Sequence, residues 1–219
     1  MSATSVVATK HLPSSSGRTK KTLKKALPAR LNLFGNLLIL AAGFILFFTF
    51  GPALKEEAEY SVRQTLKIEK DLTPPNTDFS IVIPKIGAVA PVFENTDPFD
   101  PRKYLPILLK GVAHAKDTAL PGEFGNTYLF AHSTDAFYNV GRYNAVFYLL
   151  GKLEKGDKIE VYYKGEKIEY EVAEKKVVGP EAVKYLGKLG EWSTLTLQTC
   201  YPPGTTLKRL VVVANQINY

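Results

Sequence analysis

Cysteine and histidine are scarce in this sequence of 219 residues, which has one Cys and three His. A single Cys excludes an intrachain disulfide, and these few residues cannot form the Cys/His clusters that hold structural zinc. Acidic residues likewise show no spacing typical of a calcium site. We therefore expect no metal and no cofactor. The lone thiol, Cys200, is either a small buried residue or a reactive group.

Acidic residues are absent from positions 1–54, a stretch that carries seven of the 28 Lys and Arg residues. The rest of the chain then has 28 − 7 = 21 basic residues against 21 acidic ones, so it is formally neutral. The net charge of +7 and the pI of about 9.3 therefore belong to the amino-terminal segment. This distribution argues against a nucleic-acid-binding protein.

Charge of either sign is absent from residues 31–54, a run of 24 residues. As a helix this run would be about 36 Å long, enough to cross a bilayer. Basic residues precede it and acidic residues follow it, which predicts a basic cytoplasmic tail over 1–30, a transmembrane anchor over 31–54 and an extracytoplasmic remainder. The alternative is a cleaved signal peptide, for which the densest apolar part is short enough.

Residues 55–78 are charged and helix-favouring at first and then contain Pro74 and Pro75, which is typical of a stalk or linker. Residues 79–219 suffice for one core. Strand patterns dominate them, with a hairpin predicted around Lys164-Gly165 and helical apolar spacing only over 104–110 and 145–153. The predicted fold is an all-β barrel with short helical connections.

Cys200 ends an alternating strand over 194–200, and the following loop returns into a strand that starts at Arg209. If these strands pair antiparallel, Cys200 and Arg209 face each other. His132, at the end of a strand over 126–131, could act as acid and base for a thiol nucleophile, and Arg209 could stabilise an oxyanion. Each residue alone has a structural alternative, namely a core thiol, a satisfied imidazole and a surface cation. His114, the other histidine outside the tail, could be the partner of the thiol instead.

These residues resemble the sortase family. The run Thr196-Leu197-Gln198-Thr199-Cys200 matches the sortase signature Thr-Leu-x-Thr-Cys, and Arg209 follows at a sortase-like distance. Further similar segments are Ile83-Pro84-Lys85-Ile86, Gly111-Val112-Ala113-His114, Leu120-Pro121-Gly122 through Asn126, and Ala131-His132-Ser133. The resemblance covers 79–219 and implies an eight-stranded sortase-type β-barrel, preceded by one transmembrane helix.

The resemblance also implies a membrane-bound cysteine transpeptidase with Cys200 as nucleophile, His132 as acid and base, and Arg209 as the cation at the oxyanion or substrate. Such enzymes cut a Leu-Pro-any-Thr-Gly sorting signal of exported surface proteins and transfer the acyl group to an amine of the cell envelope or a pilin. His114 would be a wall residue or support the site. Thr199, Leu120 and Pro121 are candidates for lining the groove.

Two other functions fit the same residues. A hydrolytic cysteine peptidase would release the same thioester to water. A non-catalytic, membrane-tethered peptide-binding β-barrel would need no reaction at Cys200.

Overall fold

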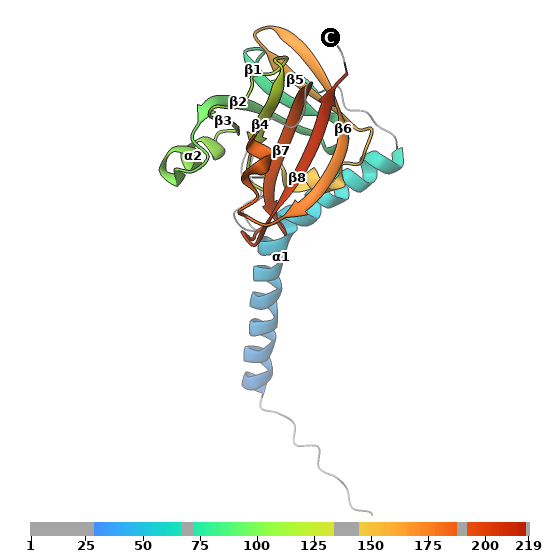
Figure 1. Cartoon of the computed structure of the whole chain (residues 1–219). Helices are drawn as coiled ribbons and strands as arrows, with labels where there is room; N and C mark the ends of the chain where they lie inside the picture. Colours follow the sequence, from blue (N-terminus) through green and yellow to red (C-terminus); the bar gives the residue numbers. More distant parts are fainter. Residues whose placement is uncertain (1–28, 67–71, 134–144, 188–191, 218–219) are drawn as a thin grey trace, which may run out of the picture. The chain divides into compact units, whose positions relative to one another are not determined.

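The computed structural model describes residues 29–66, 72–133, 145–187 and 192–217. The strands between Phe79 and Gln216 form a closed barrel of eight strands (Figure 1). The strands are β1 (Phe79–Ile83), β2 (Ala88–Thr96), β3 (Val112–Ala115), β4 (Gly125–Phe130), β5 (Lys158–Tyr163), β6 (Glu166–Val178), β7 (Ser193–Tyr201) and β8 (Lys208–Gln216). The helices are α1 (Ala29–Leu66), α2 (Pro101–Leu108) and the short 3₁₀ segments η1 (Pro84–Ile86), η2 (Tyr148–Lys152) and η3 (Val183–Leu186).

The strand order around the barrel is β1-β2-β3-β4-β7-β8-β6-β5, which confirms the all-β prediction. Strand β2 is parallel to β3 and β4 is parallel to β7, whereas the other neighbours are antiparallel. The predicted hairpin joins β5 to β6 through Lys164 and Gly165, whose φ angles are 51° and 87°. Two left-handed residues are what a tight hairpin turn of this kind requires.

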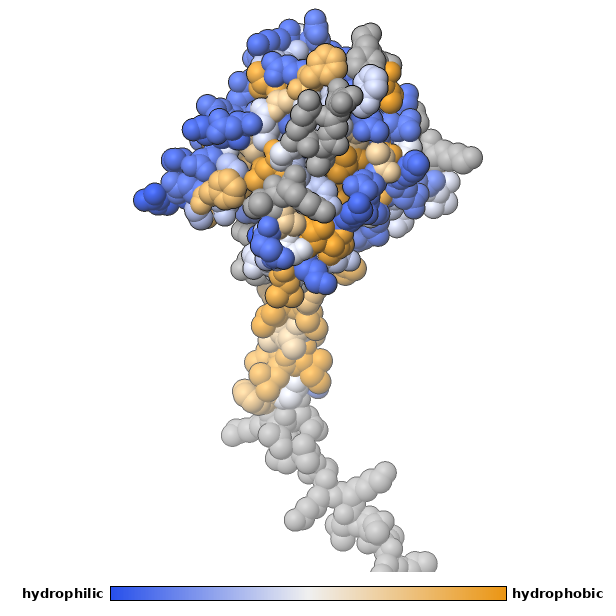
Figure 2. Space-filling view, in the orientation of Figure 1, coloured by the Kyte–Doolittle hydropathy of each residue, from blue (hydrophilic) through white to orange (hydrophobic). Residues whose placement is uncertain are grey.

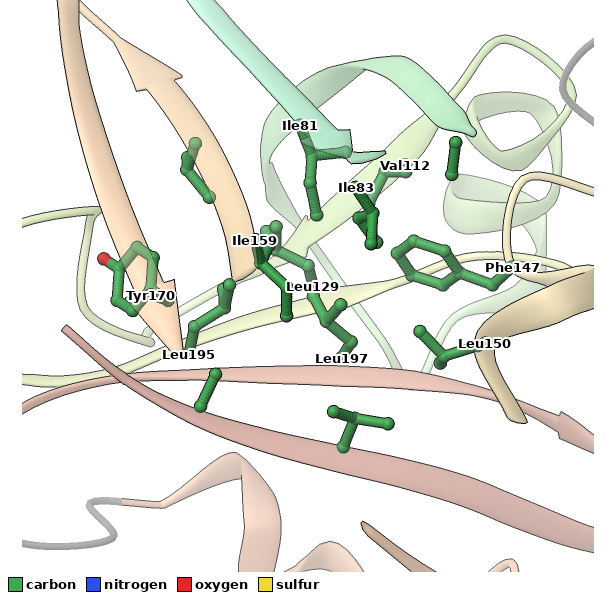
Figure 3. Close-up of a cluster of buried hydrophobic side chains, with 14 of the residues drawn as sticks. Ile81, Ile83, Val112, Leu129, Phe147, Leu150, Ile159, Tyr170, Leu195 and Leu197 are labelled. Carbon is green, nitrogen blue, oxygen red and sulfur yellow. The ribbon is translucent and has the colours of Figure 1, made fainter. Parts of the chain in front are cut away.

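The barrel interior is filled by aliphatic and aromatic side chains that alternate along each strand (Figure 3). Strand β7 contributes Leu195 and Leu197, and β8 contributes Leu210 and Val212. Segment η2 and the residue before it close one end with Phe147 and Leu150. The interior is therefore a packed core, and any chemistry has to take place on the outside or at the rim.

A second apolar cluster lies on the outer face of β3, β4 and β8, because its strand residues alternate with those of the interior. It contains Tyr128 and Phe130 of β4 and Val211 and Val213 of β8. Leu108 of α2 and Tyr185 of η3 cover this face. Asn126 ties η3 to the sheet, since its Nδ2 donates to the carbonyl of Tyr185 at 2.6 Å.

Helix α1 is the one described helix that is long and apolar enough to span a bilayer, which suggests a membrane anchor (Figure 2). It continues as a helix to Leu66, so the first part of the predicted stalk is helical. Most of the predicted basic tail, residues 1–28, lies outside the described residues. The chain divides into compact units at 1–41 and 42–219, so the later part of α1 belongs to the barrel's unit.

Truncating a core side chain should destabilise the barrel. Leu197 is fully buried, and Leu197→Ala is expected to lower the free energy of unfolding by about 3 kcal/mol, from lost burial and the cavity left behind. Chemical denaturation of the full-length protein in detergent measures this change. Leu207→Ala is the control, because that side chain is 71% exposed and should cost less than about 0.5 kcal/mol.

Candidate active site

Cys200 lies near the end of β7, on the outer face of the barrel. Leu195 and Leu197 point inward, so Thr199 faces inward as well, and Gln198 and Cys200 face outward by alternation. The Cα atoms of Cys200 and Arg209 are partners in the β7–β8 ladder. Cys200 and Arg209 therefore occupy directly opposite positions on one face of the sheet. This pairing is the one expected from the sequence for two antiparallel strands.

His132 reaches the same level of the sheet from the neighbouring strand. In the parallel β4–β7 pair, Phe130 is opposite Gln198, so two further residues bring the chain to His132 on one side and Cys200 on the other. Ala131 is held at this point by two contacts with β7. Its N–H donates to the carbonyl of Gln198 at 3.2 Å, and its carbonyl accepts from Thr199 Oγ1 at 2.9 Å.

Cys200, His132 and Arg209 line a single cavity of about 410 Å³. The rest of its wall is mainly apolar and comes from α2, the outer face of β4 and the segment around η3, and includes Phe99, Tyr104, Leu105, Leu108, Tyr128, Phe130, Ala182 and Leu186. Phe99 and Leu105 are exposed, which is typical of a surface that binds apolar side chains. The cavity therefore brings a thiol, an imidazole and a guanidinium to one open space.

The guanidinium of Arg209 is oriented by the loop between β7 and β8. Its Nη1 donates to the carbonyls of Thr206 and Lys208 at 3.1 and 3.0 Å. An arginine has five N–H donors in a fixed plane, so these two bonds hold the plane while other donors stay available for an oxygen in the cavity. The arrangement suits the stabilisation of a developing oxyanion.

Buried Tyr128 and half-buried Gln198 form a polar pair in the wall of the cavity. The hydroxyl of Tyr128 donates to Oε1 of Gln198 at 2.5 Å. Burial raises the pKa of Tyr128, and the nearby Arg209 opposes this only in part, so the phenol keeps its proton at neutral pH. Because Oε1 accepts from Tyr128, the amide of Gln198 has its Nε2 group to donate toward a bound peptide.

Residues 81–217 match the family model described as the sortase domain. This chain belongs to the sortase family. Sortase D of Bacillus subtilis (strain 168) is 32% identical over 138 residues, which cover 62% of this chain and 61% of that relative. The chain therefore matches less than two thirds of that relative's length.

Solved sortases have the same fold. A sortase D5 transpeptidase from Clostridium perfringens is 26% identical, with a TM-score of 0.53, and the similarity covers 81% of this chain and 95% of the other. Sortase C-1 from Actinomyces oris is also 26% identical, with a TM-score of 0.56 and coverage of 76% and 99%. These similarities agree with the predicted sortase-type barrel.

Of the other residues that the sequence suggested for the site, only Thr199 lines the cavity. Thr199 lines the cavity and also faces Ala131. His114, Leu120 and Pro121 are not among the described residues that line the cavity. Leu120 packs against the interior cluster and Pro121 is buried beside it in sequence, which is consistent with a turn that seals the barrel.

His114 is held inside the fold as a neutral imidazole. It is 3% exposed, its Nδ1 accepts from the backbone N–H of Asn95 at 3.4 Å, and its Nε2 lies 3.1 Å from the carbonyl of Ala119. A carbonyl only accepts, so the proton is on Nε2. Burial lowers the pKa of His114, in spite of the opposing contact with Ala119.

The apolar wall from α2 and η3 was not predicted as part of the site. The helical spacing over 104–110 was visible in the sequence, but no local pattern tells which sheet face a short helix covers. Gln198 was visible only as the variable position of the Thr-Leu-x-Thr-Cys signature. Within the described ranges, no three His, Cys, Asp or Glu side chains are grouped so that they could hold a metal ion.

Burial of neutral His114 should make stability depend on pH. In the unfolded chain a histidine titrates near pH 6.5, whereas the pKa of folded His114 is lower, so the unfolded state binds more protons as the pH falls below about 6.5. The free energy of unfolding is then expected to decrease from pH 7.5 to pH 5, and His114→Gln should flatten this slope. Equal slopes in both proteins, measured by denaturation of the full-length chain in detergent, would contradict this assignment.

Proposed function

We propose that this sortase is a cysteine transpeptidase that cleaves a sorting signal of the Leu-Pro-any-Thr-Gly type and transfers the acyl group to an amine. The observation that carries the proposal is the common cavity of Cys200, His132 and Arg209, in which each residue meets one requirement of acyl transfer. The enzyme class follows from family membership, and the chemistry and placement of the three residues support the roles proposed for them.

In the first half of the reaction, the Cys200 thiolate attacks the carbonyl carbon of the scissile amide. A C–S bond forms, and the carbonyl electrons move to oxygen, where the Arg209 guanidinium stabilises the negative charge. When the tetrahedral intermediate collapses, the C–N bond breaks and protonated His132 gives its proton to the departing amine. The product is a thioester on Cys200.

In the second half, a neutral amine attacks the thioester carbonyl. The C–S bond breaks and the sulfur leaves as a thiolate, while His132 takes the proton that the amine nitrogen must lose. Water in place of the amine would give hydrolysis by the same steps. The acceptor therefore decides between a transferase and a peptidase.

The composition of the cavity supports an apolar donor peptide. Tyr104, Leu105 and Phe130 form a wall on which Leu and Pro side chains can be buried, and Gln198 can donate to a peptide carbonyl. These features favour the sorting signal of exported surface proteins as substrate. The amine would come from the cell envelope or a pilin.

The amino-terminal charges support one orientation in the membrane. All basic residues before Leu54 precede the apolar run and acidic residues follow it, so the amino terminus would be cytoplasmic and the barrel extracytoplasmic at the plasma membrane. A single-pass anchor of this kind would hold the enzyme where exported proteins emerge.

Trapping the thioester tests the proposed reaction. The full-length protein in detergent, mixed with a fluorescent Leu-Pro-any-Thr-Gly peptide, should form a covalent adduct on Cys200 that mass spectrometry detects, and an added amine should convert it to a conjugate. Cys200→Ala should form no adduct. Formation of the adduct with only hydrolysed product in the presence of amines would indicate a peptidase, and no adduct at all would indicate a binding protein.

Substitutions of the two partner residues should separate their roles. Arg209→Ala is expected to reduce kcat about 10²- to 10³-fold, as loss of an oxyanion donor does. His132→Ala should prevent thioester formation, whereas His114→Gln should leave it close to the wild-type rate, because His114 lies in the fold interior. Loss of the thioester in His114→Gln, in a protein whose folding is intact by circular dichroism, would reverse the assignment of the two histidines.

A further inference from the structure

A second cavity, of about 400 Å³, adjoins Cys200. The two cavities share Thr199 and Cys200, and beyond these their walls differ. The second is built from η2, the far part of β6 and the start of the β7–β8 loop, together with Glu57 of α1. Cys200 therefore lies between the two cavities and lines both.

The segment after β4 also contributes neighbouring residues to the two cavities. Ala131 and His132 line the first cavity, whereas the next residue, Ser133, lines the second. Cys200 therefore lines both cavities, and His132 lines the first directly before a residue that lines the second.

The second cavity differs from the first in charge. Its wall holds Lys152, Lys175 and Lys176 against Glu57, which makes a formal charge of 3 − 1 = +2. The first cavity has one permanent cation, Arg209, and large apolar side chains such as Leu105 and Phe130 line its wall. An apolar peptide is suited to the first cavity, and a polar molecule with negative charge is suited to the second.

The three lysines are held in different ways. Lys175 Nζ donates to the carbonyls of Gly151 at 2.5 Å and Leu153 at 2.6 Å, so it is fixed to the end of η2. Lys152 Nζ lies 2.9 Å from Glu57, and Lys176 Nζ lies 2.6 Å from Glu174, a residue outside the cavity wall. The side chains of Lys152 and Lys176 are 41% and 54% exposed, so a ligand can reach both.

We propose that the second cavity receives the amine acceptor, and that its lysines select an amine carried on a molecule with a nearby carboxylate. The inference rests on the proposed transpeptidase function. The thioester acyl group fills the first cavity, and the amine approaches the carbonyl from the second. Its nitrogen forms the new C–N bond, the C–S bond breaks, and the nitrogen's proton passes to His132.

The same charge also favours the reactive form of the acceptor. Only a neutral amine is a nucleophile, and surrounding positive charge disfavours the ammonium form. The carboxylate is attracted by the lysines while the amine loses its proton more easily. Binding and activation are thus served by the same side chains.

Two acceptors that differ in one charge test the inference. Full-length protein in detergent is given the fluorescent Leu-Pro-any-Thr-Gly peptide with either glycylglycine or glycylglycinamide, and KM is measured for each acceptor. The wild type should have a lower KM for glycylglycine. In Lys152→Gln and Lys176→Gln, the KM ratio between the two acceptors should move toward one by about threefold for each charge removed.

A substitution of opposite sign sharpens the comparison. Glu57→Gln removes the one acidic side chain of the described cavity wall, so the preference for glycylglycine should increase. Lys167→Gln is the matched control, because Lys167 of β6 pairs with Glu160 of β5 and Glu169 of β6 and does not line either cavity. Comparing ratios between proteins cancels the different intrinsic reactivities of the two amines.

The outcomes separate the two proposals. Thioester formation without acceptor should be the same in the wild type and all four variants. With equal thioester formation, either of two results overturns the acceptor inference and leaves the transpeptidase proposal intact. One is an unchanged KM ratio in the lysine variants. The other is a KM ratio that changes in Glu57→Gln in the same direction as in the lysine variants. If the wild type forms no thioester, the proposed function fails and the inference fails with it.

Discussion

The antiparallel pairing of β7 with β8 is the constraint on which the rest of the site depends. One register places Leu197 opposite Val212 inside the barrel, Gln198 opposite Val211 outside it, and Cys200 opposite Arg209 at its end. Because side chains alternate between faces, a slip of one residue would turn Cys200 into the core and Leu197 outward. The hydrophobic interior therefore holds Cys200 and Arg209 opposite each other.

The apolar cluster on the outer face of the barrel forms part of the wall of the site. Tyr128, Phe130 and Val211 are apolar or aromatic residues that would be exposed on an isolated barrel, and Leu108 and Tyr185 cover part of them. The part of this outer face that includes Tyr128 and Phe130 also lines the cavity beside Cys200. The apolar surface thus stabilises the attachment of α2 and η3 and also forms an apolar wall of the cavity beside Cys200.

Much of this arrangement could be predicted from the sequence, because it depends on local alternation. The strand before Cys200, the loop and the strand from Arg209 could be predicted directly, and the Lys164-Gly165 pair between two alternating runs predicted a hairpin. The parallel β4–β7 pairing could not be read, since it joins segments about 70 residues apart, and it is this pairing that brings His132 level with Cys200. For the same reason the His114 imidazole and the helical walls could be placed only by the fold.

Residues 55–219 are formally neutral as a whole, but positive charge is in local excess beside Cys200. At physiological ionic strength the screening length is about 8 Å, so charges distributed over the surface of the barrel act only on groups in their immediate neighbourhood. Lysines in the cavity wall can then influence a carboxylate that has entered, but they cannot steer it from a distance. Selection of the acceptor would accordingly appear in its binding at the thioester, at the moment when an amine and water compete for the same carbonyl carbon.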